Sequence, residues 1–517
     1  MAFATLGVAV AVGAAEGGWE AEGRAAVQRI RASTPAKGPA RNVILFVGDG
    51  MGVSTVTAAR ILEGQLRGRP GEENLLSFER LPHTALAKTY NTNQQVPDSA
   101  GTMTALVTGR KTRAGVLSID ESVARGDHRA AAAHPLPTLF EQAEVRGLRT
   151  GIVTTARVTH ATPAACYAHS PDRNWEDDAK LPAPARADGF PDLARQLIEF
   201  DAGDGLEVVL GGGRAHFLPI EHADPEYPEQ TGLRRDGRDL IEAWRERSPA
   251  SATVWSRDQL EALELAEVDH LLGLFEPSHM RWEAHRGTDP AGEPSLAEMT
   301  ETAIRLLQRG PSGFVLMVEG GRIDHGHHAS SAYLALHDTI AFAEAVERAL
   351  ALVDLDDTLV VVTADHSHVL TIAGYPTRGN PILGLVVTND ARGESSAEPV
   401  RDLSGLPYTT LGYGNGPGYT GASDQQPEGP KHFPHRPSHA SGIRAGRPDL
   451  SETDTRAPDF LQESAIPMQS ETHGGEDVAI YAGGPGAELF RGVQEQSYVY
   501  HAIVDALGWT SQPSDGD

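Results

Sequence analysis

The chain has 517 residues, of which 40% are hydrophobic and 22% are charged, and its formal net charge is −27 at pH 7. This composition is typical of a globular protein in water, and the acidic balance argues against binding to nucleic acid or to anionic membranes. A single cysteine, Cys166, excludes an internal disulfide and a cysteine-rich zinc site.

The first residues have the character of an export signal. Residues 1–15 are apolar, and small residues follow, although no basic segment precedes the apolar run. We therefore expect a periplasmic or secreted protein. No other segment approaches about 20 uninterrupted apolar residues, so no transmembrane helix is predicted.

Short apolar runs recur along the chain and predict buried strands. They are rich in Val and Ile and lack polar alternation, which is typical of strands covered on both faces. Helical patterns lie between them, such as residues 331–353 and residues 295–308, where Ser295 and Glu298 have capping-box spacing. The predicted strands are residues 42–47, 150–155, 206–210, 313–318, 358–363 and 476–482.

Strands that alternate with helices predict an α/β fold with a large, mostly parallel central sheet flanked by helices on both faces. Ligands of such sheets bind beyond the carboxyl ends of the strands. We expect one domain over residues 40–508. Charged or Gly- and Pro-rich sequence interrupts the alternation at about residues 214–294 and 374–467, and both segments are interpreted as insertions.

Polar side chains gather directly after the predicted strands. "GRIDHGHH", Gly321 to His328, is one of five such clusters of carboxylates and histidines. One cluster alone is as readily a solvated loop, but the repetition predicts a site for several metal ions. Mixed Asp and His ligands suit zinc, and an all-oxygen set suits magnesium. The groups are Asp49, Ser99, His160, Thr162, Glu319, Asp324, His325, His328, Asp365, His366, His368 and His473.

Ser99, in "VPDSAGTMTALVTG", is the candidate nucleophile. A helical pattern begins directly after it, so Asp98 or Ser99 is alternatively only a helix N-cap. A helix N-terminus also presents free N–H groups to a phosphate. A serine there needs a base or a metal to become a nucleophile, and no histidine neighbours it in the sequence. Arg173 is either an ordinary surface arginine or a bidentate clamp on phosphoryl oxygens.

Taken together, these motifs resemble the alkaline phosphatase family, in the same order over residues 40–508. The matching segments are "GDGMG", "PDSAGT", "TTARVTHATPAACYAHSPDRNW", "GLFEP", "VEGGRIDHGHH", "TADHSH", "YGNGPGY", "ETHGGEDVAIYA" and "VQEQ". The animal-type branch is the more similar one, because the enteric bacterial branch has aspartate and lysine at the positions of His160 and His325. The resemblance implies hydrolysis of phosphate monoesters through a phosphoserine on Ser99, with release of inorganic phosphate.

The resemblance also implies metal ions and their ligands. Arg173 would clamp the phosphate, and His325 would reach it through water. Asp324, His328 and His473 match the first zinc site, and Asp49, Asp365 and His366 match the second. Asp49, Thr162 and Glu319 match a magnesium site, with His160 beside it. A calcium site would use Glu226, the Phe275 backbone, Glu276 and either Glu293 or Asp289, because two extra residues separate Asp289 from "EPSL".

Further expectations concern assembly and rival functions. Family members form homodimers in which the counterpart of Tyr375 reaches the partner, and residues 374–467 would form the crown-type insertion. The ending "TSQPSDGD" has no hydrophobic tail, so no membrane anchor is expected. The alternative functions are a phosphodiesterase of the same superfamily and, in a different class, a non-catalytic protein that binds metal or phosphate.

Overall fold

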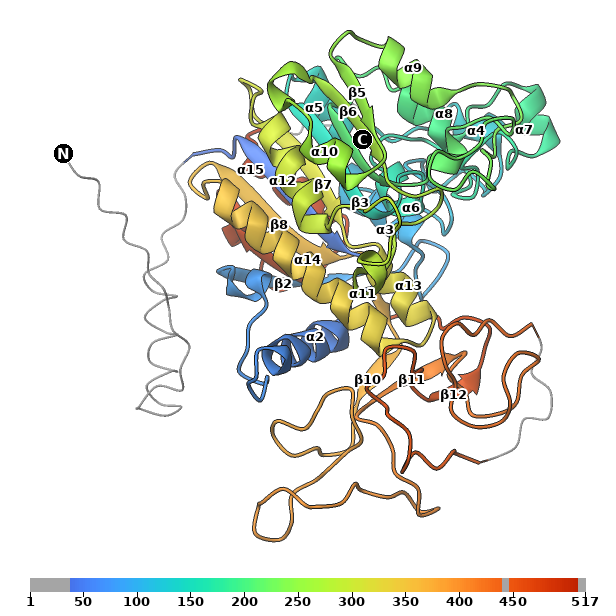
Figure 1. The fold of residues 1–517 in the computed structure, drawn as a ribbon. Coiled ribbons are helices and arrows are strands. Elements are labelled where there is room, and N and C mark those ends of the chain that lie inside the picture. Colours follow the sequence, from blue (N-terminus) through green and yellow to red (C-terminus); the bar gives the residue numbers. More distant parts are fainter. Residues whose placement is uncertain (1–37, 439–445, 510–517) are drawn as a thin grey trace.

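The computed structural model describes residues 38–438 and 446–509, and the predicted export signal lies outside them. A large central sheet dominates the fold (Figure 1). Its strands are β1 (Asn42–Gly48), β2 (His83–Lys88), β3 (Arg149–Arg157), β4 (Val208–Gly212), β5 (Ser251–Val254), β6 (His270–Leu274), β7 (Phe314–Glu319), β8 (Thr358–Ala364), β14 (Val478–Gly483) and β15 (Val493–Glu495).

The ten strands lie in the order β15-β2-β14-β8-β1-β7-β3-β4-β6-β5. All neighbours from β8 to β5 pair in parallel, which confirms the predicted mostly parallel α/β sheet. β14 runs antiparallel to both of its neighbours, β8 and β2. The start of β14, rather than its end, therefore lies at the edge where the parallel strands finish.

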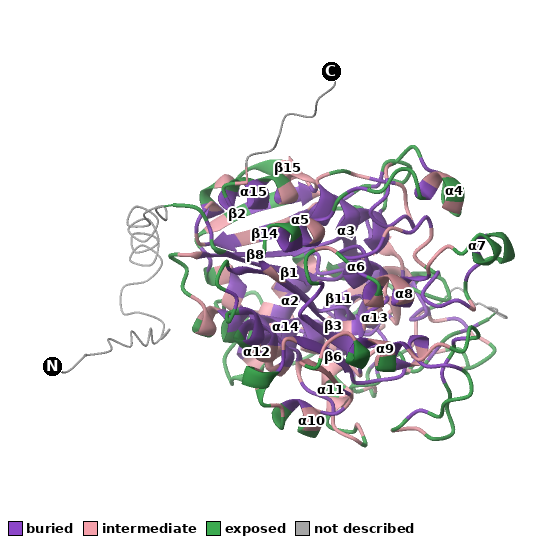
Figure 2. Cartoon of the chain, turned by 90° about the horizontal axis from the view of Figure 1, so that it is seen from above, coloured by how far each residue is buried: buried purple, intermediate pink, exposed green. Residues whose placement is uncertain are grey.

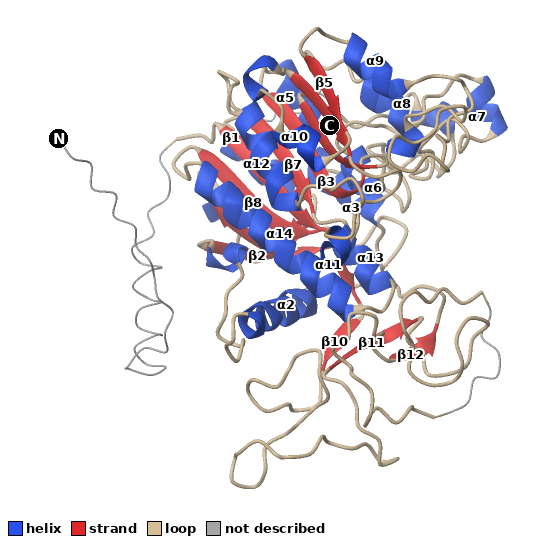
Figure 3. Cartoon of the chain, in the orientation of Figure 1, coloured by secondary structure: helices blue, strands red, loops and turns tan. Residues whose placement is uncertain are grey.

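Helices cover both faces of the sheet, as predicted (Figure 3). One layer contains α2 (Val53–Leu66), α12 (Leu296–Leu307) and α14 (Ala332–Leu352), and the other contains α3 (Ser99–Thr108), α5 (Leu139–Val145), α6 (Ala161–Ala164) and α15 (Tyr498–Ala506). The shorter helices are α4 (His128–Ala131), α7 (Ala183–Ala187), α8 (Leu193–Ile198), α9 (Leu240–Glu246), α10 (Arg257–Glu261), α11 (Glu283–Arg286) and α13 (Arg322–His328), and the 3₁₀ turns are Ser77–Arg80, Arg214–His216, Leu265–Glu267 and Ala487–Leu489.

Local sequence signals explain several element boundaries. The predicted capping box of α12 is present: Ser295 Oγ accepts the Glu298 N–H at 3.2 Å, and the Glu298 carboxylate accepts the Ser295 N–H at 2.8 Å. β1, β7 and β8 are buried at every position (Figure 2), as their unbroken apolar runs predict. The centre of the sheet is thus fixed by hydrophobic burial on both faces.

The two interrupted segments differ in their relation to the sheet. Residues 214–294, predicted as an insertion, belong partly to the core fold, because they contribute the last two strands of the sheet, β6 and β5. Residues 374–467 carry most of a separate small sheet, with strands in the order β10 (Leu370–Ile372), β11 (Leu411–Gly416) and β12 (Ser464–Pro467), away from the central one (Figure 1). A further pair, β9 (Ser367–His368) and β13 (His473–Gly474), joins the loop after β8 to the segment before β14.

Two buried carboxyl groups meet at the end of the sheet where the parallel strands β3 and β4 begin, opposite the end where they finish. Thr150 binds both: its Oγ1 donates to Glu144 Oε1 at 2.5 Å, and its N–H donates to Glu207 Oε2 at 2.6 Å. Burial, followed by the charge of Glu144, raises the pKa of Glu207 to about 9. Burial likewise raises the pKa of Glu144 to about 7. At neutral pH the folded state therefore retains protons on these two carboxyl groups that the unfolded chain releases.

Glu207→Gln is expected to stabilise the protein at alkaline pH. A raised carboxyl pKa contributes stability below about pH 4.5, which is lost as the pH rises through about 9. The amide stays neutral, so the variant should gain roughly 2 kcal/mol over the wild type at pH 9 and nothing at pH 5. Thermal unfolding between pH 5 and 10 measures this, with Glu347→Gln on the exposed face of α14 as control. A difference that is the same at every pH would contradict the prediction.

Candidate metal centre

Three carboxylates lie side by side where the central strands end. Asp49 directly follows β1, Glu319 is the last residue of β7, and Asp365 directly follows β8. β1 pairs with both other strands, and Val47 lies opposite Glu319 in the register. All three side chains are fully buried. Parallel pairing thus brings together at one edge the groups that the sequence places after separate strands.

Several oxygen atoms at this edge have no hydrogen-bond partner within the described chain. They are both carboxylate oxygens of Asp49, Oγ1 of Thr162 at the start of α6, and Oε1 of Glu319. Burial raises the pKa of Asp49 well above its usual value, with further contributions from the neighbouring carboxylates, and it raises the pKa of Glu319 to about 8. Buried acceptors without partners are costly, and a hard cation with oxygen ligands would satisfy all of them. The predicted magnesium set therefore fits its ion.

Ser99 begins α3 next to a second group of metal-capable atoms. His366 Nε2 lies 3.1 Å from Ser99 Oγ, 3.4 Å from Asp49 Oδ1 and 3.3 Å from Asp365 Oδ2. Burial holds the pKa of His366 well below its usual value, so the ring is neutral and can act as a ligand. Ligands on the edges of a zinc tetrahedron with bonds near 2.05 Å lie about 3.3 Å apart, and these separations match that spacing.

A third group gathers around Asp324 on α13. His328 Nε2 and His473 Nε2 lie 3.3 Å and 3.4 Å from Asp324 Oδ1, and 3.2 Å from each other. The Nδ1 atoms of the two rings donate to backbone carbonyls, His328 to Glu471 at 2.6 Å and His473 to Pro97 at 2.7 Å. Both Nε2 atoms are therefore acceptors that face the same point. Their spacing again fits a tetrahedral zinc ion.

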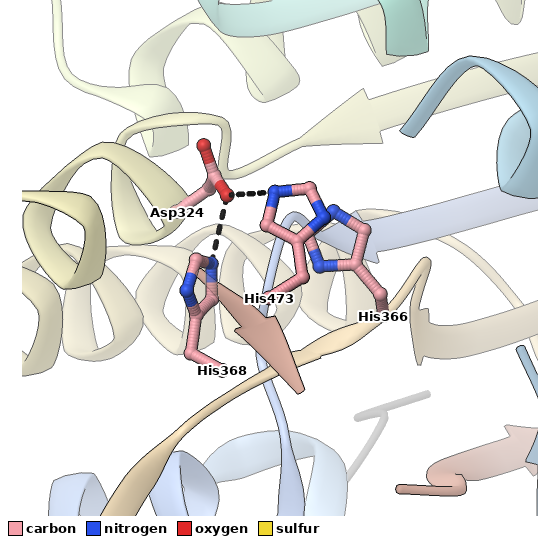
Figure 4. A group of neighbouring side chains, drawn as sticks. All are labelled: Asp324, His366, His368 and His473. Atoms are coloured by element: carbon pink, nitrogen blue, oxygen red, sulfur yellow. Dashed lines mark hydrogen bonds and ion pairs between the residues drawn. The ribbon is translucent and has the colours of Figure 1, made fainter. Parts of the chain in front are cut away.

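His368 also contacts Asp324, in a different way (Figure 4). Its Nε2 is 2.7 Å from Asp324 Oδ1, which is a hydrogen-bond distance and too short for two ligands of one zinc ion. Its Nδ1 is 2.5 Å from Glu471 Oε2. The two carboxylates raise the pKa of His368 to about 10 although burial opposes this. We interpret His368 as a charged double donor that orients Asp324. The sequence placed it among the metal-capable groups but gave no sign of this role.

The other histidines of "GRIDHGHH" face different surroundings. His327 is fully buried and lies 3.0 Å from Thr55 Oγ1 and 2.8 Å from the Tyr413 hydroxyl, so it supports the fold. His325 lies against His279, with ring centroids 4.1 Å apart. Sequence reasoning missed His279, because nothing in "FEPSHM" distinguishes it from a surface histidine.

Arg173 is held beside Ser99. Its Nη1 donates to Asp98 Oδ2 at 3.1 Å, and its Nη2 lies 3.2 Å from His160 Nε2. Asp98 is also the N-cap of α3, because its Oδ1 accepts the Gly101 N–H at 3.2 Å. Asp98 is therefore the cap and Ser99 the first helical residue, and the role of Ser99 as nucleophile stays a prediction. The phosphate-clamp candidate and the nucleophile candidate are fixed by the same aspartate.

The predicted calcium ligands come together next to His279. Glu226 Oε2 pairs with Arg214 at 3.1 Å, and Glu276 Oε1 lies 3.2 Å from Arg281 Nε. Burial and neighbouring carboxylates raise the pKa of Glu276 to about 7. Both candidates for the fourth ligand are present: Asp289 Oδ2 is buried without a partner among described residues, whereas both Glu293 oxygens accept the Arg281 N–H. Asp289 therefore has the freer oxygen, and Phe275 directly precedes Glu276.

A cavity of about 940 Å³ opens onto His328 and His473, two of the side chains whose spacing fits a zinc ion. Asp98, His328 and His473 lie at its wall together with Tyr419 and Met468. The space admits a substrate whose phosphate reaches the metal-capable atoms while the rest of the molecule stays outside. A nucleophile candidate, an arginine clamp and sites for several cations, grouped beside this cavity, are the requirements for metal-assisted displacement at phosphorus.

Fold and site define the chain as a metal-dependent hydrolase of phosphate esters. A sequence model of the alkaline phosphatase family matches residues 40–509. The chain belongs to the alkaline phosphatase family, and its activity is the hydrolysis of phosphate monoesters.

Relatives and solved structures agree with this assignment. Tissue-nonspecific alkaline phosphatase of Gallus gallus is 46% identical over 473 residues, which cover 90% of this chain and 84% of the relative. The human tissue-nonspecific enzyme is 43% identical, covering 90% and 83% of the two chains. Among structures, Thermus thermophilus alkaline phosphatase is 26% identical with a TM-score of 0.62, covering 93% of this chain and 94% of that one. An Antarctic bacterial enzyme, at 21% identity and a TM-score of 0.58, shares the fold over 92% of this chain and 100% of its own.

Within residues 38–438 and 446–509, the structure has no helix of the length and hydropathy needed to cross a bilayer.

Proposed function

We propose that Ser99 is the nucleophile of a two-step displacement at phosphorus. The observation that carries this proposal is the spacing of Ser99 Oγ, Asp49, Asp365 and His366, in which Nε2 of His366 lies 3.1 to 3.4 Å from an oxygen of each other group. His366 is within hydrogen-bond distance of Ser99, but the same Nε2 atom also faces Asp49 and Asp365, an arrangement that suits a shared metal ion that activates Ser99.

The proposed metal content is two zinc ions, one magnesium ion and one calcium ion. The zinc ions would be held by Asp324, His328 and His473 and by Asp49, Asp365 and His366, and the magnesium by Asp49, Thr162 and Glu319. Glu226, the Phe275 backbone and Glu276 would hold calcium together with Asp289, whose free oxygen favours it over Glu293. When bound, the zinc ions supply Lewis-acid stabilisation of the attacking and leaving oxygens.

The side chains then have distinct tasks. Arg173 binds two phosphoryl oxygens through its guanidinium, which Asp98 holds in place at 3.1 Å. Ser99 Oγ, as its proton leaves to solvent, forms a bond to phosphorus, and the bond from phosphorus to the ester oxygen breaks. The departing alkoxide takes a proton from solvent and leaves as an alcohol. Water then attacks the phosphoserine, releases inorganic phosphate and restores Ser99.

His160, His325 and His368 act without touching the reacting bonds. His160 lies against Arg173 and directly before α6, which carries the magnesium candidate Thr162. His325 would contact the phosphate through water. His368 donates hydrogen bonds to Asp324 and Glu471 and thereby fixes the orientation of a proposed zinc ligand.

Assembly and location extend the proposal. We propose a homodimer in the periplasm or outside the cell, as in the family. The exposure of Tyr375 supports the proposed dimer. The residue is 92% exposed, which is unusual for a tyrosine and suits a side chain that reaches a partner.

Arg173→Ala is expected to lower kcat/KM for a nitrophenyl phosphate monoester by about 10- to 100-fold, because a charged hydrogen-bonding clamp is lost. The corresponding diester has fewer free oxygens for the clamp, so it should be hydrolysed far more slowly by the wild type and be little affected by the substitution. Steady-state rates on both esters measure this. Arg125→Ala, which removes the nearby exposed arginine paired with Asp172, is the matched control. A wild type that prefers the diester would show that the chain is a phosphodiesterase.

A further inference from the structure

A second, smaller cavity lies beside the proposed active site. Its volume is about 380 Å³, and its wall includes His279, Trp282, His285 and Arg322. It adjoins the active site, because Arg322 Nη1 lies 3.2 Å from His325 Nδ1 and the His279 ring packs against the His325 ring. Nothing in the proposed mechanism uses this space.

Arg322 is a buried cation that forms no ion pair with any residue the structure describes. The residue is 7% exposed, and its Nε is buried without a partner among described residues. Of the five N–H donors of a guanidinium, only one on Nη1 forms a hydrogen bond with a described residue, His325. Burying an unpaired charge is costly, so the protein retains this cation at a stability cost.

The carboxylates around Arg322 are engaged with other groups. Asp338 and Glu293 act on it from a distance, but neither forms an ion pair with it in the described chain. Asp338 Oδ2 accepts the Glu283 N–H at 3.2 Å, and Glu293 accepts the Arg281 N–H at 2.9 Å. The two other charged residues on the cavity wall are Glu276, which is also a proposed calcium ligand, and Arg281, which pairs with Glu276 and Asp289 at 3.2 and 3.3 Å. Arg322 is therefore the arginine of this wall that has no ion pair with a described carboxylate.

Trp282 adds a second donor without an acceptor. Its Nε1 is buried and has no hydrogen-bond partner among described residues. Its ring stacks on the Arg322 guanidinium, with the central carbon 3.6 Å from the ring centroid, and Phe433 packs edge-on against its other side at 5.2 Å. The stacking holds the guanidinium in place. Both residues line the cavity, and the cation and the N–H each lack an acceptor among described residues.

We propose that this cavity is an anion subsite that binds a phosphate or carboxylate group through Arg322 and Trp282. The occupant is either the second anionic group of a substrate whose scissile phosphate lies at Ser99, or a free oxyanion. The inference rests on the proposed function for the place of the scissile phosphate. It extends that function by naming a substrate class, phosphate monoesters with a second, remote anionic group.

Equilibrium binding tests the subsite directly. Inorganic phosphate would be titrated by calorimetry into the metal-loaded enzyme, to concentrations beyond saturation of the Ser99 site. We expect one further phosphate to bind per chain. Arg322→Gln should weaken this binding at least tenfold and Trp282→Phe severalfold. Arg305→Gln, which removes an exposed arginine of α12, should leave it unchanged.

Kinetics separate the two sources of the anion. The ratio of kcat/KM for carboxyphenyl phosphate to kcat/KM for phenyl phosphate is compared between the wild type and the variants. Because it is a ratio, any general effect of Arg322→Gln through His325 cancels. If the substrate supplies the anion, the ratio falls about tenfold in Arg322→Gln. If the second phosphate binds but the ratio is unchanged, the occupant is a free anion and the subsite still stands.

Two results would contradict the proposal, each together with an unchanged ratio of kcat/KM. In the first, no second phosphate binds to the wild type. In the second, the second phosphate binds to Arg322→Gln and Trp282→Phe as tightly as to the wild type. Turnover of phenyl phosphate by the same preparations reports on the proposed function itself, so failure of the subsite and failure of Ser99 catalysis are distinguishable. Trp282→Phe keeps an aromatic ring at this position and removes the N–H donor. It therefore provides the test if Arg322→Gln does not fold.

Discussion

Ser99→Ala is expected to lower kcat for phosphate monoesters by roughly four to six orders of magnitude. The substitution removes the atom that accepts the phosphoryl group, and loss of a covalent nucleophile has effects of this size in other hydrolases. Arg173 and the metal ligands remain, so the inhibition constant of inorganic phosphate should change by less than about tenfold. Steady-state kinetics and phosphate inhibition provide the two measurements.

A trapping experiment makes the result specific to Ser99. Acid quenching of the wild type during turnover of a radiolabelled monoester should leave label on the protein, and Ser99→Ala should leave none. Ser256→Ala is the matched control, because Ser256 also lies at a helix start, as the N-cap of α10, away from the site. It should keep full activity and lose about 1 kcal/mol of stability. A labelled Ser99→Ala protein, or one within tenfold of wild-type turnover, would show that another group accepts the phosphate.

Removal of divalent cations by a chelator is expected to abolish activity, and zinc together with magnesium should restore it. Asp49, Glu319 and Asp365 are fully buried and close together, so without cations they repel one another and retain protons. The unfolding temperature should therefore fall by several degrees in the metal-free protein, since ligands that bind only the folded state stabilise it.

Partial restoration tests the assignment of the sites. Adding zinc alone should recover part of the unfolding temperature, and adding magnesium should complete it. Asp49→Asn provides the matched variant, because Asp49 belongs to both the proposed second zinc site and the magnesium site. It should lower the measured content of both metals. Full activity in a protein shown by metal analysis to be metal-free would refute a metal-dependent mechanism.

The strand-end carboxylates could be predicted from the sequence for a simple reason. Asp49, Glu319 and Asp365 each end or follow an apolar run, and parallel strands place such positions at one edge. His473 is counted with the strand-end groups although it precedes its strand, so this reasoning does not explain its place. β14 is antiparallel, which apolarity does not reveal, and only the family resemblance connected His473 with Asp324.

The remaining parts of the site depend on contacts that no local pattern encodes. The role of His368 follows from its two carboxylate partners, and Glu471 lies about a hundred residues away from it. The choice between Asp289 and Glu293 follows from which carboxylate has a free oxygen. β15 has three residues, β2 has only three apolar residues in succession, and β5 and β6 lie in polar sequence, so long apolar runs did not predict these strands.

The antiparallel β14 has a consequence for how the enzyme matures in the cell. His473, just before β14, is 145 residues beyond His328, its neighbour in the site. It is 376 residues beyond Pro97, whose carbonyl accepts a hydrogen bond from its Nδ1. A nascent chain lacks His473 until long after Pro97 and His328 have been synthesised, and contacts of such sequence separation form slowly. The proposed first zinc site would therefore be completed late, and zinc capture there would report that the segment carrying His473 has docked.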